Sequence, residues 1–267
     1  MNVSNSAIFD ANDLGTDIVT IHVGPKEKAF AIHKDLICNR SDFFSKAFNG
    51  PFKEGVDGKM HLPEDDPQAF SAVVAWMYRD QLPLFPTEQF KDDIVGCDMY
   101  INLLLPLFQL AEKLCINTLA NQVMDRFQDV HFKHSCIFDP TQLENIYAHC
   151  HGGSKLRTYG VLMVIRRGSG GHDDPDGDDE GNENEADNDD DEVFLGGLLE
   201  LQESQPDFGR DFITLQMKYG YRFQMKYGCT DAQIRDSETG FGQCFFHTHA
   251  KSEVCHLGPE PIDTNGT

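Results

Sequence analysis

The strongest constraint on the fold of this 267-residue chain is a run of acidic residues from Asp173 to Glu192. The run holds 13 acidic side chains and no basic one. A segment of this composition buries almost no apolar surface and repels itself, so we expect it to stay disordered and solvated. The chain therefore divides into a larger N-terminal part, an acidic disordered linker at 169–192 and a small C-terminal region at 193–267.

The acidic balance of the whole chain limits the partners that it can bind. It has 22 basic and 44 acidic side chains, a formal net charge of −22. Binding to a phosphate backbone depends on Lys and Arg, so we expect no direct contact with nucleic acid. No apolar stretch is long enough for a membrane span, and the N-terminal residues lack the basic and apolar regions of a signal peptide. We therefore expect an intracellular protein, in the cytoplasm or nucleus, with no membrane contact.

The expected compartment decides how the cysteines are interpreted. The sequence contains eight of them, at positions 38, 97, 115, 136, 150, 229, 244 and 255. Disulfides are rare in reducing compartments, and no C-x-x-C pair is present. We predict thiols, most of which act as small core residues.

The N-terminal part begins with the pattern of a β-hairpin. Apolar residues alternate through Val19, Ile21 and Val23, which is typical of a strand with one buried face. Residues 24–26 then supply Gly and Pro for a turn, and residues 29–33 predict a second strand.

Helix signals follow the hairpin. Ser41 is placed to cap a short Phe-rich helix, and Asp66 with Pro67 forms the start signal of a longer one. Apolar residues of that longer helix recur at helical spacing, at Phe70, Val73, Val74 and Met77. Two further helices are predicted to begin near Pro106 and near Asn117.

Short motifs in this half resemble a BTB/POZ domain, most closely the single-domain BTB proteins of filamentous fungi. The motifs are DIV at 17–19, FAIHKDLI at 30–37, RSDFF at 40–44, LPEDDP at 62–67, WMY at 76–78 and LAEKL at 110–114. The resemblance implies an α+β fold over 14–130, in which a small β-sheet is flanked by a cluster of α-helical hairpins. Residues 1–13 would be a tail. It also implies a protein–protein interaction module.

The resemblance directs attention to three residues of the hairpin. In the family, the residues that match Asp17 and Lys34 lie near a shared pocket and the dimer surface. The interpretation that we favour is a structural ion pair between them, which must stay matched because stranding one charge costs ~3–5 kcal/mol. We interpret His33 as a hydrogen-bonded core histidine in preference to a proton carrier.

A second motif bears on the partner. Phe52 and Glu54 match the apolar-x-Glu element by which some family members contact a cullin ubiquitin-ligase scaffold. An aromatic anchor beside a carboxylate is a reasonable hot spot, because a few side chains dominate interface energy. The alternative is that Phe52 covers the edge of the core while Glu54 is solvated.

The N-terminus bears on self-association. Many animal members of the family carry a long helix and an extra strand before the Asp, and these exchange between protomers. Only 16 residues precede Asp17 here, with Ile8, Phe9 and Leu14 as their bulky apolar members. We therefore do not expect a swapped dimer, whereas a plain symmetric homodimer stays open.

Helical patterns continue after the BTB-like region. Residues 131–168 predict a helical extension, with Leu143 and Ile146 in helical spacing and an apolar run at 161–165. Beyond the acidic linker, two more helices are indicated by Phe194, Leu198 and Leu201 and by Phe208, Phe212 and Leu215.

The C-terminal region holds a group of potential metal ligands, Cys244, His247, His249 and Cys255. Two thiolates and two imidazoles suit a tetrahedral zinc site, to which Cys229 could also contribute. If 244–249 were a single strand, however, Cys244 would point away from both histidines, so the site needs a turn. We favour ordinary buried cysteines and surface histidines, keep zinc as the alternative, and expect no cofactor.

Catalytic motifs do not emerge from the sequence. It contains no G-x-S-x-G elbow, phosphate loop, H-E-x-x-H pair or dinucleotide fingerprint. We predict a non-enzymatic interaction protein: either an adaptor for a cullin-type ubiquitin ligase or a BTB scaffold unrelated to ubiquitin. A zinc-dependent hydrolase built on 244–256 is the weaker alternative.

Overall fold

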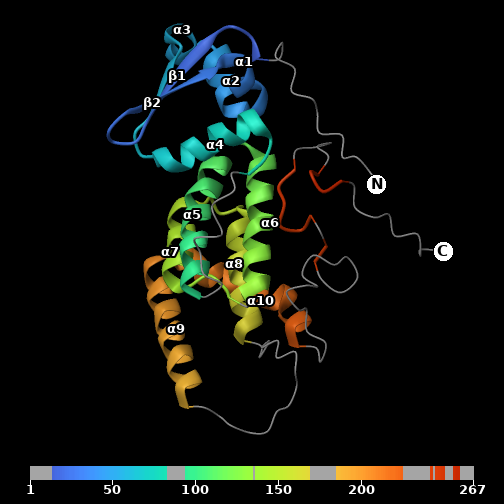
Figure 1. The fold of residues 1–267 in the computed structure, drawn as a ribbon. Coiled ribbons are helices and arrows are strands. Elements are labelled where there is room, and N and C mark those ends of the chain that lie inside the picture. Colours follow the sequence, from blue (N-terminus) through green and yellow to red (C-terminus); the bar gives the residue numbers. More distant parts are fainter. Residues whose placement is uncertain are drawn as a thin grey trace, which may run out of the picture. The chain divides into compact units, whose positions relative to one another are not determined.

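A computed structural model shows a chain of two compact units (Figure 1). The first unit comprises residues 1–86 and 106–123, and the second comprises 87–105 and 124–267. The structure describes residues 14–82, 94–134, 136–168, 185–224, 241–242, 244–249 and 255–258. The predicted tail at 1–13 lies outside the described residues.

The first unit contains a three-stranded sheet of β1 (Ile18–Val23), β2 (Lys28–His33) and β3 (Lys59–Leu62). The strand order is β2-β1-β3, with β1 antiparallel to β2 and parallel to β3. The predicted hairpin is confirmed by the pairing of Ile18 with His33. β3 was not predicted, because its four residues are too few to display a periodic pattern.

Four helices accompany this sheet: α1 (Lys34–Arg40), α2 (Asp42–Asn49), α3 (Lys53–Asp57) and α4 (Pro67–Arg79). Both predicted N-caps are confirmed. The Ser41 hydroxyl accepts a hydrogen bond from the Phe44 N–H at 3.3 Å, and the Asp66 carboxylate accepts one from the Ala69 N–H at 2.6 Å. Each cap satisfies an N–H that the first helical turn leaves without a partner.

Aromatic side chains form the centre of the first unit. Phe44, Phe70 and Trp76 are almost completely buried, and the ring centroids of Phe44 and Phe70 lie 6.5 Å apart. The indole N–H of Trp76 donates to the Gln122 side chain at 2.9 Å, so the one polar atom of this ring is satisfied.

Two long helices, α5 (Ile94–Lys113) and α6 (Asn117–His134), have residues in both units. The prediction that a helix begins near Pro106 is wrong, since Pro106 lies inside α5. A proline in a helix interior removes one hydrogen bond and clashes with the preceding turn. The helix continues through it because the preceding turns bury apolar side chains, among them Ile101 and Leu104.

The second unit adds α7 (Pro140–His149), α8 (Lys155–Gly168), α9 (Glu185–Ser204) and α10 (Pro206–Gln224). α7 and α8 lie in the predicted helical extension, and α9 and α10 contain the two apolar patterns predicted after the linker. The acidic linker, however, was predicted too long, because α9 begins within it. Acidic residues are favourable at a helix N-terminus, where the macrodipole is positive, and α9 starts in the acidic run. Residues 169–184 lie outside the described residues.

A buried arginine joins α7, α8 and α10. Arg157 of α8 donates a hydrogen bond to the Tyr147 carbonyl at 2.6 Å, and its guanidinium lies 4.4 Å from the centre of the Tyr147 ring. The Tyr147 hydroxyl donates to Asp211 of α10 at 2.9 Å. Burial, together with the nearby Asp211 carboxylate, raises the pKa of Tyr147 far above its usual value. The extension and the C-terminal helices therefore form one compact unit.

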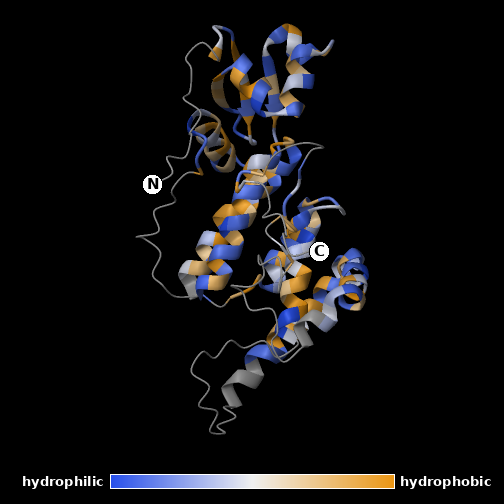
Figure 2. Cartoon of the chain, turned by 90° about the vertical axis from the view of Figure 1, so that its right-hand side faces the viewer, coloured by the Kyte–Doolittle hydropathy of each residue, from blue (hydrophilic) through white to orange (hydrophobic). Residues whose placement is uncertain are grey.

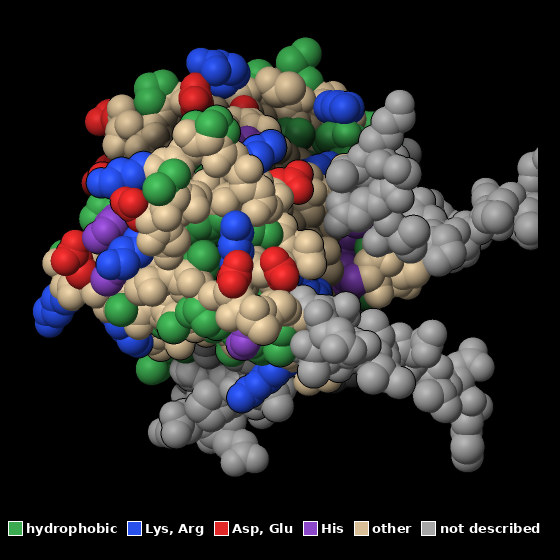
Figure 3. Space-filling model, turned by 90° about the horizontal axis from the view of Figure 1, so that it is seen from above, with side chains coloured by type: hydrophobic (Ala, Val, Ile, Leu, Met, Phe, Trp, Pro, Cys, Tyr) green, Lys and Arg blue, Asp and Glu red, His purple; other side chains and the backbone are tan. Residues whose placement is uncertain are grey.

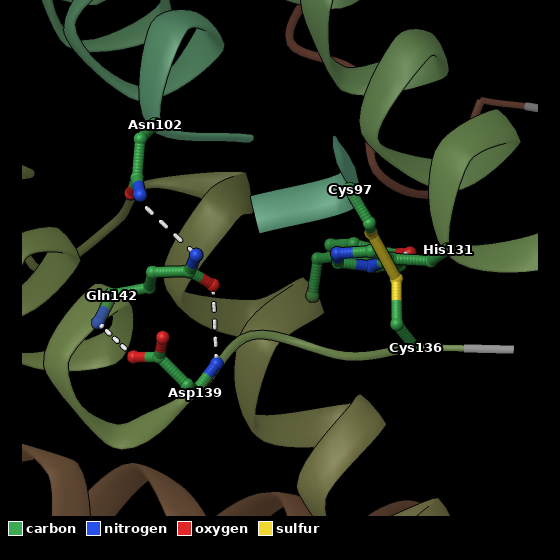
Figure 4. Close-up of a disulfide and its surroundings, with 7 residues drawn as sticks. Cys97, Asn102, His131, Cys136, Asp139 and Gln142 are labelled. Atoms are coloured by element: carbon green, nitrogen blue, oxygen red, sulfur yellow. Dashed lines mark hydrogen bonds between the residues drawn. A yellow bond between two sulfur atoms is a disulfide. The ribbon is translucent and has the colours of Figure 1, made fainter. Parts of the chain in front are cut away.

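The structure joins Cys97 and Cys136 in a disulfide (Figure 4). The prediction of thiols is wrong for this pair, because reasoning from the compartment takes no account of which cysteines the fold brings together. Five other cysteines in the described part of the chain, at positions 38, 115, 150, 244 and 255, are not disulfide-bonded. Cys229 lies outside the described residues.

A capping box starts α7 (Figure 4). The Asp139 carboxylate accepts from the Gln142 N–H at 2.7 Å, and the Gln142 side chain accepts from the Asp139 N–H at 3.1 Å. We expect Asp139→Ala to lower the free energy of unfolding by about 1 kcal/mol, measured by urea denaturation. Asp139→Asn keeps a side-chain acceptor and should cost less. Equal stabilities of the alanine and asparagine variants would contradict this role of the cap.

Hydrophobic and hydrophilic residues share the same helices (Figure 2). This distribution is typical of helices that bury one side and expose the other. Within the described ranges, no helix combines the length and the apolar character needed to cross a membrane.

Candidate functional site

The residues that match the BTB hairpin motif meet through their main chain. The Lys34 N–H, at the start of α1, donates to the Asp17 carbonyl next to β1 at 2.8 Å. Asp17 is exposed and Lys34 is half-buried. The predicted side-chain ion pair between them does not form among the residues that the structure describes. A backbone hydrogen bond therefore holds the start of α1 beside the hairpin.

His33 connects the end of β2 to α4. Its Nδ1 lies 2.7 Å from the hydroxyl oxygen of Tyr78, and its backbone N–H donates to the same oxygen at 3.3 Å. The side chain is half-buried. This geometry gives His33 a structural contact with the WMY segment of the sequence.

The short helix α3 presents an exposed apolar surface on the first unit. Phe52, its N-cap residue, is 54% exposed, and Val56, four residues later, is 86% exposed. Glu54 lies between them in the sequence and is half-buried. We call Phe52, Glu54 and Val56 the α3 surface. Large apolar side chains at such exposure contribute little to the core and are available for a partner.

Tight packing fixes the position of α3. A Cβ atom at Gly55 would lie 2.9 Å from the Phe48 carbonyl oxygen at the end of α2, so only glycine fits there without a shift. The ring of Phe52 lies against Gly50. The α3 surface is therefore held on an ordered turn, which lowers the entropy cost of binding.

The face of the molecule that Figure 3 shows carries a mixture of charges. Figure 3 views the molecule from above the orientation of Figure 1. Basic, acidic and hydrophobic side chains are interspersed on the face that it shows. No broad basic area gathers on the described part of this face.

The structure brings the four predicted metal ligands together in the second unit. One ligand atom from each of Cys244, His247, His249 and Cys255 lies within 4.8 Å of the others. Asp125 of α6 also reaches this group, and no local signal predicts it because it lies 122 residues from His247.

A further apolar stripe was also missed. Ile213, Met217 and Tyr221 lie four residues apart on α10 and are 61%, 83% and 56% exposed. Their spacing places them on one face of the helix. The pattern of Phe208, Phe212 and Leu215 predicted a helix here but did not reveal that this second apolar face is exposed.

Comparison with known proteins identifies the N-terminal domain. Residues 12–129 match the family model of the BTB/POZ domain. No curated protein matches the chain. The chain therefore contains a BTB/POZ domain, and its small sheet with many helices is the α+β fold of this domain followed by a helical extension. BTB/POZ domains are protein–protein interaction modules, which gives the chain a general interaction or scaffold role.

Proposed function

We propose that this BTB/POZ domain-containing protein is an adaptor that docks a cullin-type ubiquitin-ligase scaffold through the α3 surface. The observation that carries the proposal is the exposure of Phe52 and Val56 beside Glu54 on an ordered short helix. An apolar anchor next to a carboxylate supplies both buried area and a directional polar contact. Interfaces depend on a few such residues.

In the adaptor hypothesis the second unit selects the client. The exposed stripe of Ile213, Met217 and Tyr221 supports this division, because it offers an apolar face that the described residues of the same unit leave uncovered. The sequence motifs that resemble single-domain BTB proteins of filamentous fungi support the same arrangement, with one BTB domain and one appended helical region.

The direct test is binding of the full chain to the N-terminal domain of a cullin by isothermal titration calorimetry. We expect Phe52→Ala combined with Glu54→Ala to raise the Kd roughly 30-fold or more, because the loss of a hot spot costs about 2 kcal/mol or more. The single variants should show which of the two side chains contributes more.

Phe132→Ala is the matched control, since Phe132 lies on α6 and is 52% exposed, almost the same as Phe52. It should leave the Kd unchanged. A wild-type chain that binds no cullin, or binds it no better than the double variant, would reject the adaptor. The alternative, a BTB scaffold for a partner unrelated to ubiquitin, would then take its place.

Self-association is a separate part of the proposal. A symmetric homodimer would present two α3 surfaces to its partners. Light scattering after size-exclusion chromatography measures the mass of the full chain, and the mass of a monomer over the accessible concentration range would remove the homodimer from this scheme.

A further inference from the structure

We propose that Cys244, His247, His249 and Cys255 bind a single structural zinc ion, and we call these residues the Cys/His cluster. The cluster belongs to the second unit and is independent of the proposed adaptor function. Two thiolates and two imidazoles are a ligand set of closed, four-coordinate zinc sites.

A turn brings the first two ligands to the same side. The His247 N–H donates to the Cys244 carbonyl at 3.0 Å, which bends the chain over residues 244–247. An extended strand would have directed Cys244 away from the histidines. A similar bond from Gly258 to the Cys255 carbonyl, at 2.9 Å, turns the chain after the last ligand.

The spacing of the ligand atoms suits zinc. Bond lengths of about 2.0–2.1 Å to nitrogen and 2.3 Å to sulfur give ligand–ligand distances of about 3.3–3.8 Å around a tetrahedral ion. Cys255 Sγ lies 3.4 Å from His247 Nδ1, within this range. All four atoms lie within 4.8 Å of one another, so small side-chain rotations complete the tetrahedron.

Asp125 orients the imidazole ring of His247. Its carboxylate lies 3.0 Å from His247 Nε2. Because a carboxylate accepts, Nε2 carries the proton, and a neutral imidazole then has its lone pair on Nδ1. Nδ1 is the nitrogen that faces Cys255. Metal-bound histidines are commonly oriented by a carboxylate in this way.

Neighbouring side chains hold the cluster in place. Phe246, between the ligands, is 2% exposed and packs edge-on against Tyr159 of α8. Lys155 of α8 donates to the Phe245 carbonyl at 2.7 Å. Figure 1 draws the short described segments near the C-terminus in red, and these contacts attach them to α6 and α8. Zinc would crosslink residues 244–249 and 255–258.

The closed ligand set argues against the zinc-dependent hydrolase that the sequence left as the weaker alternative. A catalytic zinc site keeps one position open for water, whereas four protein ligands fill a tetrahedral site. Among the four ligands, His247 is buried at 3% exposure, and Cys244, His249 and Cys255 are half-buried. The expected role of the ion is therefore stabilisation of the fold.

A second group of possible metal ligands, Asp125, His247 and His256, shares His247 with the Cys/His cluster. It would bind a metal through His247 Nε2, whereas the Cys/His cluster uses Nδ1. The Asp125 oxygens lie 3.0 Å from His247 Nε2 and 2.7 Å from His256 Nε2, which are hydrogen-bond distances. This geometry favours Asp125 as the group that orients both histidines.

The first test is elemental analysis of the full chain, purified without chelators, reconstituted with zinc and dialysed. We expect one zinc ion per wild-type chain. Cys244→Ser and Cys255→Ser should lose it, whereas His256→Ala should keep it. Cys115→Ser, at an exposed cysteine of the first unit, is the control and should also keep it. Wild-type protein without stoichiometric zinc overturns the proposal, as does retention in Cys244→Ser with loss in His256→Ala.

Two further measurements do not depend on the folding of the cysteine variants. Wild-type protein reconstituted with cobalt(II) should show the intense visible absorption and thiolate charge-transfer band of a tetrahedral, sulfur-ligated ion, and a weak octahedral spectrum overturns the proposal. Asp125→Asn should weaken zinc binding about 10- to 100-fold in competition with a chromophoric chelator. An unchanged affinity would reject the orienting role of Asp125.

Discussion

Replacing Trp76 with alanine is expected to lower the free energy of unfolding of the first unit by about 3–5 kcal/mol. Trp76 is 1% exposed, so the change removes a large buried ring and leaves a cavity. The Gln122 side chain also loses the indole N–H that donates to it at 2.9 Å. Domains are stable by only about 5–15 kcal/mol, so this one substitution removes a large part of the margin.

The measurement is urea denaturation followed by circular dichroism, because Trp76 is the single tryptophan and its loss removes the fluorescence signal. Trp76→Phe keeps most of the buried ring and should cost less than the alanine variant. Phe52→Ala, at a half-exposed aromatic of the same unit, should change stability by no more than about 0.5 kcal/mol. Similar losses in Trp76→Ala and Phe52→Ala would contradict the assignment of Trp76 to the core.

The second unit should lose stability in acid through His131. This residue is 1% exposed, stacks on Tyr159 and has its Nδ1 2.9 Å from the Tyr159 hydroxyl. Burial lowers the pKa of His131 from 6.5 to about 3. Between these pH values the unfolded chain binds a proton that the folded chain does not. The contribution of His131 to the free energy of unfolding is therefore complete above pH ~6.5. Below that pH it falls by up to about 1.4 kcal/mol per pH unit.

His131→Gln tests this dependence, because glutamine does not titrate and can still hydrogen-bond to Tyr159. The variant loses the ring, so its unfolding free energy at pH 7 should be lower, but its slope between pH 6.5 and 4 should be shallower than that of the wild type. His149→Gln, at an exposed histidine of α7, should keep the wild-type slope. Parallel curves for His131→Gln and the wild type would show that His131 does not carry the effect.

Local signals predicted much of the fold. The hairpin followed from alternating apolar residues and a Gly-Pro turn, and the start of α4 followed from Asp66 and Pro67, because these features act within a few residues of one another. The order of the motifs was sufficient to identify the BTB/POZ domain. Errors occurred where burial outweighed a local rule. α5 passes through Pro106 because its apolar residues gain more from burial than the proline costs.

The features of the two candidate sites also fall into those that the sequence predicted and those that only the fold decided. The sequence by itself determined that Phe52 and Glu54 lie close together, and that two thiols and two imidazoles are present near the C-terminus, since both depend on neighbours in the chain. Only the tertiary structure decided that Phe52 stays half exposed, that Cys97 meets Cys136, and that Asp125 reaches His247. Exposure and long-range contacts depend on how helices pack, and hydrophobic packing is not directional. Residues 122 positions apart therefore carry no local mark of their meeting.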